Sequence, residues 1–381
     1  MGHYVNDAPF DPRTIEEMTP AQERVYLASQ WRLMWWKFKR HKLAVISALF
    51  LGFVYFCVIF AGPIAPYAQD TRHVEHIYAP PQSVHLFDEN WNFIGPFVYG
   101  YDYKLNMENL KREYTVNTGK IQRLRFFCLG DTYRFWGLIE SRFHVMCPAE
   151  GEPTFLLGSD RLGRDVLSRI IYGARVSMTI GLVGITVAII LGLFFGGLAG
   201  YFGGKVDMVV QRIIEVLQSI PSIPLWLSIA ALVPVTWSPL AVYFFITIIL
   251  GLIDWTGLAR AVRSKLFSLR EEDYVLAAQL MGASSGRIIS RHLVPGFTSH
   301  LIAAASLSIP TMILGETALS FLGLGLRAPI TSWGVLLQDA QNINVVALYP
   351  WLMFPVVPVI LVVLAFNFLG DGLRDAADPY K

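Results

Sequence analysis

The chain has 381 residues and a formal net charge of +2. Hydrophobic residues make up 54% of it and Asp, Glu, Lys and Arg together only 16%, whereas soluble domains carry about 25% charged residues. So few charges cannot cover a water-soluble globule of this size, and so apolar a chain is not intrinsically disordered. The small net charge excludes a strong basic field for nucleic acid, and three cysteines are too few for a disulfide scaffold. An integral membrane protein is the class that remains.

Six apolar stretches predict membrane-spanning helices. Residues 43–62 form a run of 20 without a charge, and a helix needs about 20 apolar residues to cross about 30 Å of hydrocarbon. This run is too long, and too far from the first residue, for a secretory signal. The third stretch, 206–235, has charges in its first third and contains three prolines. We therefore expect a span that begins at a membrane interface and is bent by proline. The six predicted spans are 43–62, 176–202, 206–235, 240–253, 298–326 and 350–370.

Basic residues predict the orientation of these spans. Four of them precede the first span: Lys37, Lys39, Arg40 and Lys42. Short flanks rich in Lys and Arg stay in the cytoplasm. We therefore expect the N-terminus inside, and six spans return the C-terminus to the same side. The loop 258–297, with six basic residues, is then cytoplasmic, and the long segment after the first span is outside.

The predicted spans divide the chain into five parts. A cytoplasmic segment, 1–42, contains an amphipathic interfacial helix. The first span, 43–62, is followed by an insert, 63–155, that is too long for a simple loop and has strand-like pieces such as 122–128. The core, 156–371, holds the other five spans, and a tail, 372–381, is cytoplasmic. We expect the insert to be a small, mostly β subdomain.

Two of the three cysteines, Cys128 and Cys147, lie in the insert. An oxidising compartment would permit a disulfide between them. The sequence leaves open whether their Cα atoms lie close enough to form it.

Catalytic motifs are missing from the sequence. The nearest approach to a phosphate-binding loop, at 203–206, lacks the first glycine and the Ser or Thr. One G-x-S-x-G stands at 282–286, but a helix-like segment precedes it, where a nucleophile elbow needs a strand. We predict no catalytic residue and no metal site. An ion gradient or another subunit must then supply the energy for any uphill transport.

The loop between the fourth and fifth spans is the most informative segment. Residues 273–281 favour a helix that Gly282 ends, and a second helix, 285–293, is predicted to run to Pro295. Loops of about 40 residues rarely lack structure or a partner. The small side chains of Ala277 and Ala278 would allow the first helix to dock closely on another protein. An amphipathic linker on the membrane is the alternative interpretation.

This loop resembles the coupling motif of ABC importer permeases, E-A-A-x3-G-x9-I-x-L-P. Four positions match the motif: Ala277, Ala278, Gly282 and Pro295. Leu276, His292 and Val294 stand in place of its Glu, Ile and Leu. Further blocks are similar, in the same order, to the dipeptide/oligopeptide/nickel permease family, and to its second, C-type subunit. They are 157–169, 254–255 with 259–263, 314–325 with 332–334, and 365–375. The long insert departs from the shorter members of that family.

The resemblance implies an all-α polytopic fold, with six helices and a type I (MetI-like) permease core, to which the mostly β periplasmic insert is added. It implies a permease subunit of an ATP-driven, binding-protein-dependent importer for peptides or peptide-sized solutes, and not an enzyme. The implied partners are a second homologous permease, two cytoplasmic ABC ATPases that bind ATP and Mg, a periplasmic solute-binding protein and membrane lipid. The resemblance implies that this chain binds no cofactor and has no nucleic-acid partner. The location would be the bacterial inner membrane.

The resemblance also assigns coupling to the ATPases to one stretch of the loop. The residues concerned are Asp273, Tyr274, Val275, Ala277, Ala278, Gly282, Ala283 and Ser284. Their small and mixed side chains would contact a groove on the ATPase subunit.

Charged residues within the spans are costly and need an explanation. Arg212 and Glu215, three residues apart, could pair on one helix face, and Asp254 lies near an arginine cluster at a predicted interface. Glu316 is deeper and has no evident local partner, so it either lines the transport pathway or bonds a neighbouring helix or the partner permease. An ion-gradient-driven secondary transporter that uses Glu316 as its proton carrier is the alternative function. Such transporters often contain internal repeats, and we find none.

Overall fold

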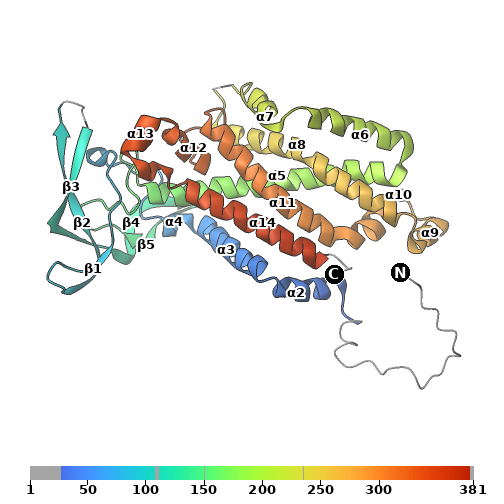
Figure 1. Ribbon diagram of the computed structural model, residues 1–381, viewed down its shortest axis with the longest axis horizontal. Coiled ribbons are helices and arrows are strands. Elements are labelled where there is room, and N and C mark those ends of the chain that lie inside the picture. The colour runs from blue at the N-terminus through green and yellow to red at the C-terminus, as the bar shows by residue number, and fades with distance from the viewer. Residues whose placement is uncertain (1–26, 108–110, 150, 235, 378–381) are drawn as a thin grey trace, which may run out of the picture.

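The computed structural model describes residues 27–107, 111–149, 151–234 and 236–377. The predictions for residues 1–26 and 378–381 lie outside this part of the chain. Figure 1 shows an elongated bundle of helices with the β-strands at one end and the short helix α9 at the other. The long helices run along the length of the molecule between these two ends.

Five helical stretches within the described residues are long and apolar enough to cross a membrane. They are α3 (Lys42–Ile59), α5 (Val166–Phe202), α8 (Pro239–Leu269), the stretch Ser285–Phe321 that ends with α11 (Val294–Phe321), and the stretch Pro350–Ala377 that ends with α14 (Val356–Ala377). The fold is therefore helical with several candidate spans.

A bent pair of helices occupies the place of the predicted third span. α6 (Gly204–Ser219) and α7 (Ser222–Ala230) meet at an angle of 83°. Pro221 stands at the break, where its missing N–H and its ring end the preceding helix. By length and composition the pair is a broken span or a re-entrant loop, and with it the number of candidate spans is six.

Several helices are longer than the sequence predicts. α5 begins at Val166, ten residues before the predicted start at 176, because the carboxylate of Asp165 accepts the N–H of Ser168 at 2.7 Å and caps the helix. α8 extends to Leu269 and so includes part of the predicted loop. A π-helical turn, Ile288–Leu293, leads directly into α11, so the second loop helix does not stop before Pro295. Pro295 lies in the first turn of α11. The N–H groups of a first turn have no partner within the helix, so the missing N–H of proline costs no hydrogen bond there.

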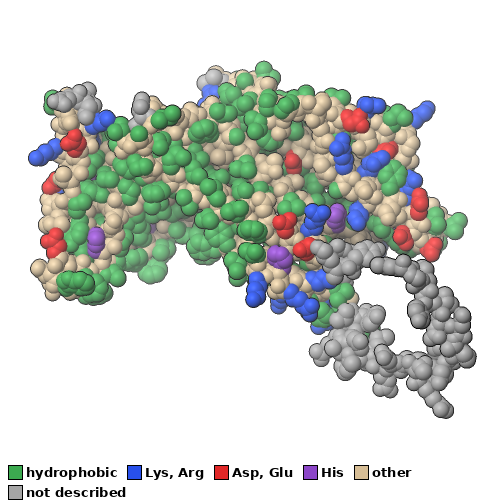
Figure 2. Space-filling model, viewed as in Figure 1, with side chains coloured by type: hydrophobic (Ala, Val, Ile, Leu, Met, Phe, Trp, Pro, Cys, Tyr) green, Lys and Arg blue, Asp and Glu red, His purple; other side chains and the backbone are tan. Residues whose placement is uncertain are grey.

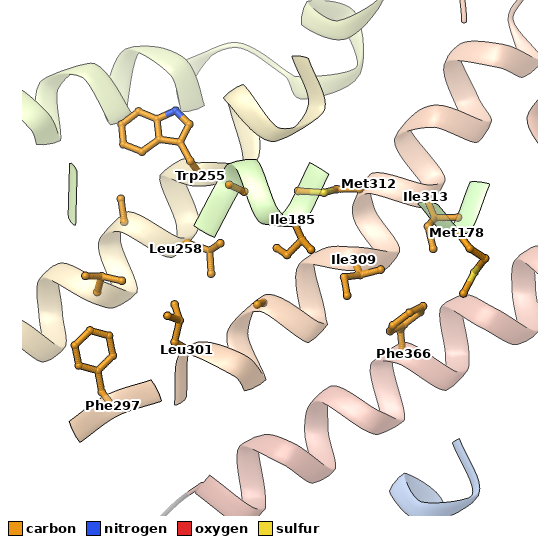
Figure 3. Close-up of a cluster of buried hydrophobic side chains, with 14 of the residues drawn as sticks. Met178, Ile185, Trp255, Leu258, Phe297, Leu301, Ile309, Met312, Ile313 and Phe366 are labelled. Atoms are coloured by element: carbon orange, nitrogen blue, oxygen red, sulfur yellow. The ribbon is translucent and has the colours of Figure 1, made fainter. Parts of the chain in front are cut away.

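The main core lies between α5, α8, α11 and α14. Figure 3 shows Met178 and Ile185 of α5 facing side chains of the other helices, including Leu258, Met312 and Phe366. α5 and α8 approach each other so closely that a Cβ on Gly196 would lie 2.5 Å from the carbonyl oxygen of Ala259. Glycine is therefore required at this crossing.

Within the described residues, the insert between the first two long helices contains five strands. β1 (His85–Phe87), β2 (Phe93–Asn106) and β3 (Lys111–Arg123) form one antiparallel sheet. β4 (Arg125–Phe135) and β5 (Ile139–Cys147) form a separate antiparallel hairpin. The predicted strand at 122–128 is thus divided between two sheets. Leu124 marks the division and donates its N–H to the carbonyl of Pro96 at 3.0 Å.

Short helices connect these larger elements. α2 (Gln30–Arg40) precedes α3 and α4 (Ala61–Ile64) follows it, while α12 (Trp333–Gln338) and α13 (Ile343–Leu348) lie between α11 and α14. α2 packs on the end of α14 through Phe38, which is buried in a small cluster with Ala376.

Candidate functional site: an exposed loop helix and the buried charges

The short helix α9 (Asp273–Leu280) lies at the end of the bundle opposite the strands (Figure 1). One residue of α9, Val275, is fully buried, and it belongs to the main core together with Ile288 and Leu293 of the π-helical turn. This single buried side chain fixes the helix to the bundle. Most of its other side chains are exposed.

α9 and the following turn expose several large apolar side chains, alongside the polar Asp273 and Gln279. Leu280 is 90% exposed and Met281 is 87% exposed. Tyr274 and Leu276 are exposed on the same short helix. Exposed apolar patches of this kind mark interaction sites. The geometry therefore indicates a docking surface for another protein or for the membrane.

Gly282 ends α9 for a conformational reason. Its φ is +80°, in the left-handed region that side chains other than glycine rarely adopt. The N–H of Gly282 bonds the carbonyl of Gln279 at 2.9 Å, and the N–H of Ala283 bonds that of Ala278 at 3.0 Å. These two bonds form the Schellman motif, which satisfies the last carbonyls of a helix. A Cβ at Gly282 would meet no atom within 4 Å, so backbone conformation and not space selects glycine here.

The structure places the predicted coupling residues on one short stretch with different exposures. Val275 is buried, whereas Ala278 and Ala283 are half-buried. The exposed members of the set are Asp273, Tyr274, Ala277, Gly282 and Ser284. The role of these residues in coupling stays a prediction.

Glu316 is fully buried in α11 and has three hydroxyl partners. Ser320 donates to Glu316 Oε1 at 2.7 Å and Ser332 donates to the same oxygen at 2.6 Å. Ser177 of α5 donates to Oε2 at 3.1 Å. The carboxylate thus joins α5, α11 and the start of α12. The sequence offered no evident partner, although Ser320 stands four residues later, on the same face of the helix.

The serine partners of Glu316 also fix the backbone around it. Ser332 accepts the N–H of Val335 at 3.2 Å and so caps α12. Ser177 accepts the N–H of Trp333 at 3.2 Å, and Ser320 accepts that of Leu326 at 3.0 Å. This arrangement holds the turn after α11 against the bundle, which is a structural task.

The other charges singled out from the sequence are distributed differently. Arg212 and Glu215 form an exposed ion pair on α6 at 2.8 Å. Asp254 is half-buried, and its Oδ2 has no hydrogen-bond partner within the part of the chain that the structure describes. Arg263 of α8 donates from Nη2 to Asp207 Oδ2 at 2.6 Å, which ties α8 to α6.

A buried charge cluster at the strand end of the bundle was missed by the sequence reasoning. The carboxylate of Asp160 accepts from Arg164 Nε at 2.7 Å and also from Arg169 Nη1. It further accepts the N–H of Leu162 at 2.8 Å and that of Arg164 at 2.9 Å. A signal was available, because Asp160 and Arg164 are four residues apart. The pairing of Arg169 with Asp160 depends on the turn between them and could not be read from spacing.

Cys128 and Cys147 are joined by a disulfide across β4 and β5, with their Cα atoms 6.3 Å apart. In the structure the two Cα atoms therefore lie close enough for a disulfide, which the sequence alone left open. Cys57 is a free cysteine in α3.

Two family models match the chain. Residues 165–380 match the binding-protein-dependent transport system inner membrane component, and residues 29–81 match the N-terminal TM domain of oligopeptide transport permease C. The helical bundle defines a membrane-embedded protein of the permease class. The chain belongs to the family of binding-protein-dependent transport system inner membrane components.

Individual relatives are permeases with named cargo. The dipeptide transport system permease protein DppC of Alkalihalophilus pseudofirmus is 42% identical over 224 residues, covering 58% of this chain and 71% of the relative. The oligopeptide transport system permease protein OppC of Escherichia coli K12 is 41% identical over 223 residues, with the same coverage of 58% and 71%. The glutathione transport system permease protein GsiD of Pectobacterium atrosepticum is 38% identical and is covered to 72%.

One solved structure, of the MetNI methionine ABC transporter in inward-facing conformations, also matches. Its identity is 20%, the match covers 55% of this chain and 96% of that chain, and the TM-score is 0.44.

Proposed function

We propose that this chain is the permease subunit of an ATP-driven, binding-protein-dependent importer of peptides or peptide-sized solutes. The relatives named above are permeases for dipeptides, oligopeptides and glutathione, which supports this class of cargo. The chain lines the translocation pathway together with a second homologous permease. ATP and Mg bind to two separate ABC ATPase subunits, and a periplasmic binding protein delivers the solute.

The observation that carries the proposal is the form of α9. It is a short helix, fixed by one buried residue, Val275, at the end of the bundle farthest from the strands. It exposes Leu280 and Met281 in a stretch that has the small residues and the glycine turn of the coupling motif. A helix held in this way can transmit a displacement to α11 through the π-helical turn, because that turn continues directly into α11.

The proposed orientation follows from the distribution of basic residues. α2 and the start of α3 carry Lys37, Lys39, Arg40 and Lys42, which supports a cytoplasmic location for this end. α9 lies toward the same end of the molecule as α2 (Figure 1), so both face the ATPases. The strands then lie on the periplasmic side of a bacterial inner membrane, and α2 lies at the cytoplasmic membrane surface.

The alternative, a secondary transporter with Glu316 as proton carrier, finds less support. Three serine hydroxyls surround this carboxylate, and each of them also organises a neighbouring backbone segment. A proton carrier must exchange its proton with water on each side of the membrane. The contacts of Glu316 favour a fixed structural role.

The proposal is tested by affinity purification of the tagged chain from native membranes in mild detergent, followed by mass spectrometry. We expect stoichiometric recovery of a second permease and of P-loop ATPases. The double variant Leu280→Asp/Met281→Asp should lose the ATPases and keep the second permease, because both side chains are exposed and neither supports the fold. Gly286→Ala, in the same loop with no atom within 4 Å of the new Cβ, is the matched control and should keep both partners. Recovery of this chain alone, with transport that needs no ATP, would contradict the proposal.

A further inference from the structure

The hairpin formed by β4 and β5 lies outside both family models, which match residues 29–81 and 165–380. Its buried side is attached to the segment that follows α3. The buried ring of His144 contacts two carbonyl oxygens, with Nδ1 2.6 Å from that of Ala65 and Nε2 2.9 Å from that of Asp131. Tyr133, also buried, packs edge-on against His144. The hairpin is therefore fixed to the end of the first long helix.

The turn of the hairpin contacts the last residues of α3. Trp136 donates its indole N–H to the carbonyl of Ile59 at 3.2 Å. The ring of Phe135 lies 6.1 Å from that of Phe60. The guanidinium of Arg175, from α5, lies 4.5 Å from the centre of the Trp136 ring. Two helices thus hold the turn in place.

The length of α3 gives the depth of these contacts in a membrane. α3 has 18 residues, which corresponds to about 27 Å of helix, and the hydrocarbon core is about 30 Å thick. A helix this short must place one end at each boundary of the hydrocarbon. Ile59 then lies at the boundary farther from α2, and Trp136 lies beside it. Tryptophan is enriched at this depth, where its ring is apolar and its N–H is polar.

The hairpin also carries large apolar side chains that are exposed. Leu138 is 87% exposed, Phe127 74%, Leu129 71% and Ile139 64%. Leu129 lies opposite Phe143 in the strand register, and Phe143 is exposed as well. Exposed apolar patches mark sites that contact a membrane or another protein.

α3 also exposes apolar side chains, and its C-cap residue Phe60 contacts Phe135 of the hairpin. Exposed residues recur along that helix as far as the hairpin: Leu49, Phe53, Phe56 and Phe60. Figure 2 shows hydrophobic side chains gathered along this side of the molecule. α3 lies on the opposite side of the bundle from the bent pair α6 and α7 (Figure 1). Exposed apolar side chains along α3, and on a hairpin whose turn contacts the end of α3, are most simply covered by lipid.

The charges of the hairpin turn limit how deeply it enters. Arg134 and Glu140 form an exposed ion pair at 2.9 Å beside the turn. Such a pair suits the polar headgroup region and not the hydrocarbon core. The apolar side chains and the ion pair together fit an element that lies flat at the membrane surface.

We propose that the β4–β5 hairpin is a lipid-binding element that rests in the phospholipid headgroup region at the Ile59 end of α3. Phe127, Leu129, Leu138 and Ile139 contact the acyl-chain boundary, and Trp136 fixes the depth. The hairpin fastens the insert to the bilayer and so sets the position of the β1–β3 sheet above it. This inference goes beyond transport and does not depend on which solute is carried.

A fluorescence quenching experiment tests the proposal on the full chain with its co-purifying subunits in phosphatidylethanolamine–phosphatidylglycerol vesicles. Leu138→Cys is made in a Cys57→Ser background, with the Cys128–Cys147 disulfide kept oxidised, and is labelled with an environment-sensitive dye. Val116→Cys on β3, also exposed, is the matched control. Ile139→Cys gives a second hairpin position if the first variant folds poorly.

We expect a spin-labelled phospholipid to quench the hairpin label at least twofold more than the Val116 label, and aqueous iodide to do the reverse. Equal iodide quenching at both positions would overturn the proposal, because the hairpin would then face water. A hairpin label shielded from both quenchers would also overturn it, because a protein partner would then cover this surface.

Discussion

The carboxylate of Glu316 and the hydroxyl of Ser332 are joined by a hydrogen bond of 2.6 Å. The bond connects α11, part of a candidate membrane span, to the cap of α12, sixteen residues later in the chain. Ser177 adds α5 to the same carboxylate. Glu316 is thereby the point at which two long helices and the following turn are held together.

Substitutions of Glu316 should reduce stability more than they change the energy source of transport. Glu316→Ala leaves three buried hydroxyls without their shared acceptor, which should cost about 3 kcal/mol or more. Glu316→Gln keeps one acceptor oxygen and should cost about half as much. Thermal unfolding of the purified complex in detergent measures both effects. A Gln variant with unchanged stability and no transport would support the proton-carrier alternative instead.

The crossing of α5 and α8 should tolerate no side chain at Gly196. A Cβ there would lie 2.5 Å from the carbonyl oxygen of Ala259, so Gly196→Ala must push the helices apart. Overpacking of this kind costs about 1–3 kcal/mol. Gly197→Ala, one residue later, meets its nearest atom at 3.9 Å and is the matched control. Expression level and melting temperature should fall for the first variant only, and equal values for the two would show that the helices do not pack in this way.

Loss of the insert disulfide should loosen the β4–β5 hairpin. Cys128 and Cys147 are 19 residues apart, and closure of a loop of this size stabilises a fold by roughly 3 kcal/mol. The double variant Cys128→Ser/Cys147→Ser should make the insert sensitive to limited proteolysis while the helices stay intact. If the double variant, or the wild-type protein treated with a reductant, resists the protease as well as the oxidised wild type does, the hairpin is held by its other contacts alone.

The charge of Asp160 should be needed for folding of the strand end of the bundle. Asp160→Asn would leave the buried guanidinium of Arg164 without its carboxylate, and Arg169 with only the longer contact to Asp339 at 3.9 Å. Breaking a buried pair costs about 3–5 kcal/mol. The variant should be recovered from membranes in reduced yield, whereas Glu215→Gln, which breaks only an exposed pair, should be recovered normally. Equal yields would contradict a structural role for the cluster.

Much of this architecture could be predicted from hydropathy, because a membrane requires long apolar helices whose backbone bonds are all satisfied internally. The ends of those helices were less predictable. α5 begins ten residues early because Asp165 caps it, and α11 begins without a break because Pro295 fits its first turn. Neither feature interrupts the apolar pattern.

The partners of buried charges were the least predictable part. Ser320 could have been paired with Glu316 from their spacing, but Ser177 and Ser332 come from other elements. The pairing of Asp207 with Arg263 likewise depends on how α6 lies against α8. Gly282, by contrast, could be read directly, since its place at the end of a predicted helix requires the left-handed conformation that it adopts.

The most direct test of the central claim is uptake of a labelled peptide by proteoliposomes that contain the purified complex and its binding protein. The account predicts that uptake requires ATP on the side of α9 and persists when ionophores remove all ion gradients. It also predicts that Leu280→Asp/Met281→Asp abolishes uptake, while Gly286→Ala leaves it unchanged. Uptake that proceeds without ATP and stops when the proton gradient is dissipated would contradict the account.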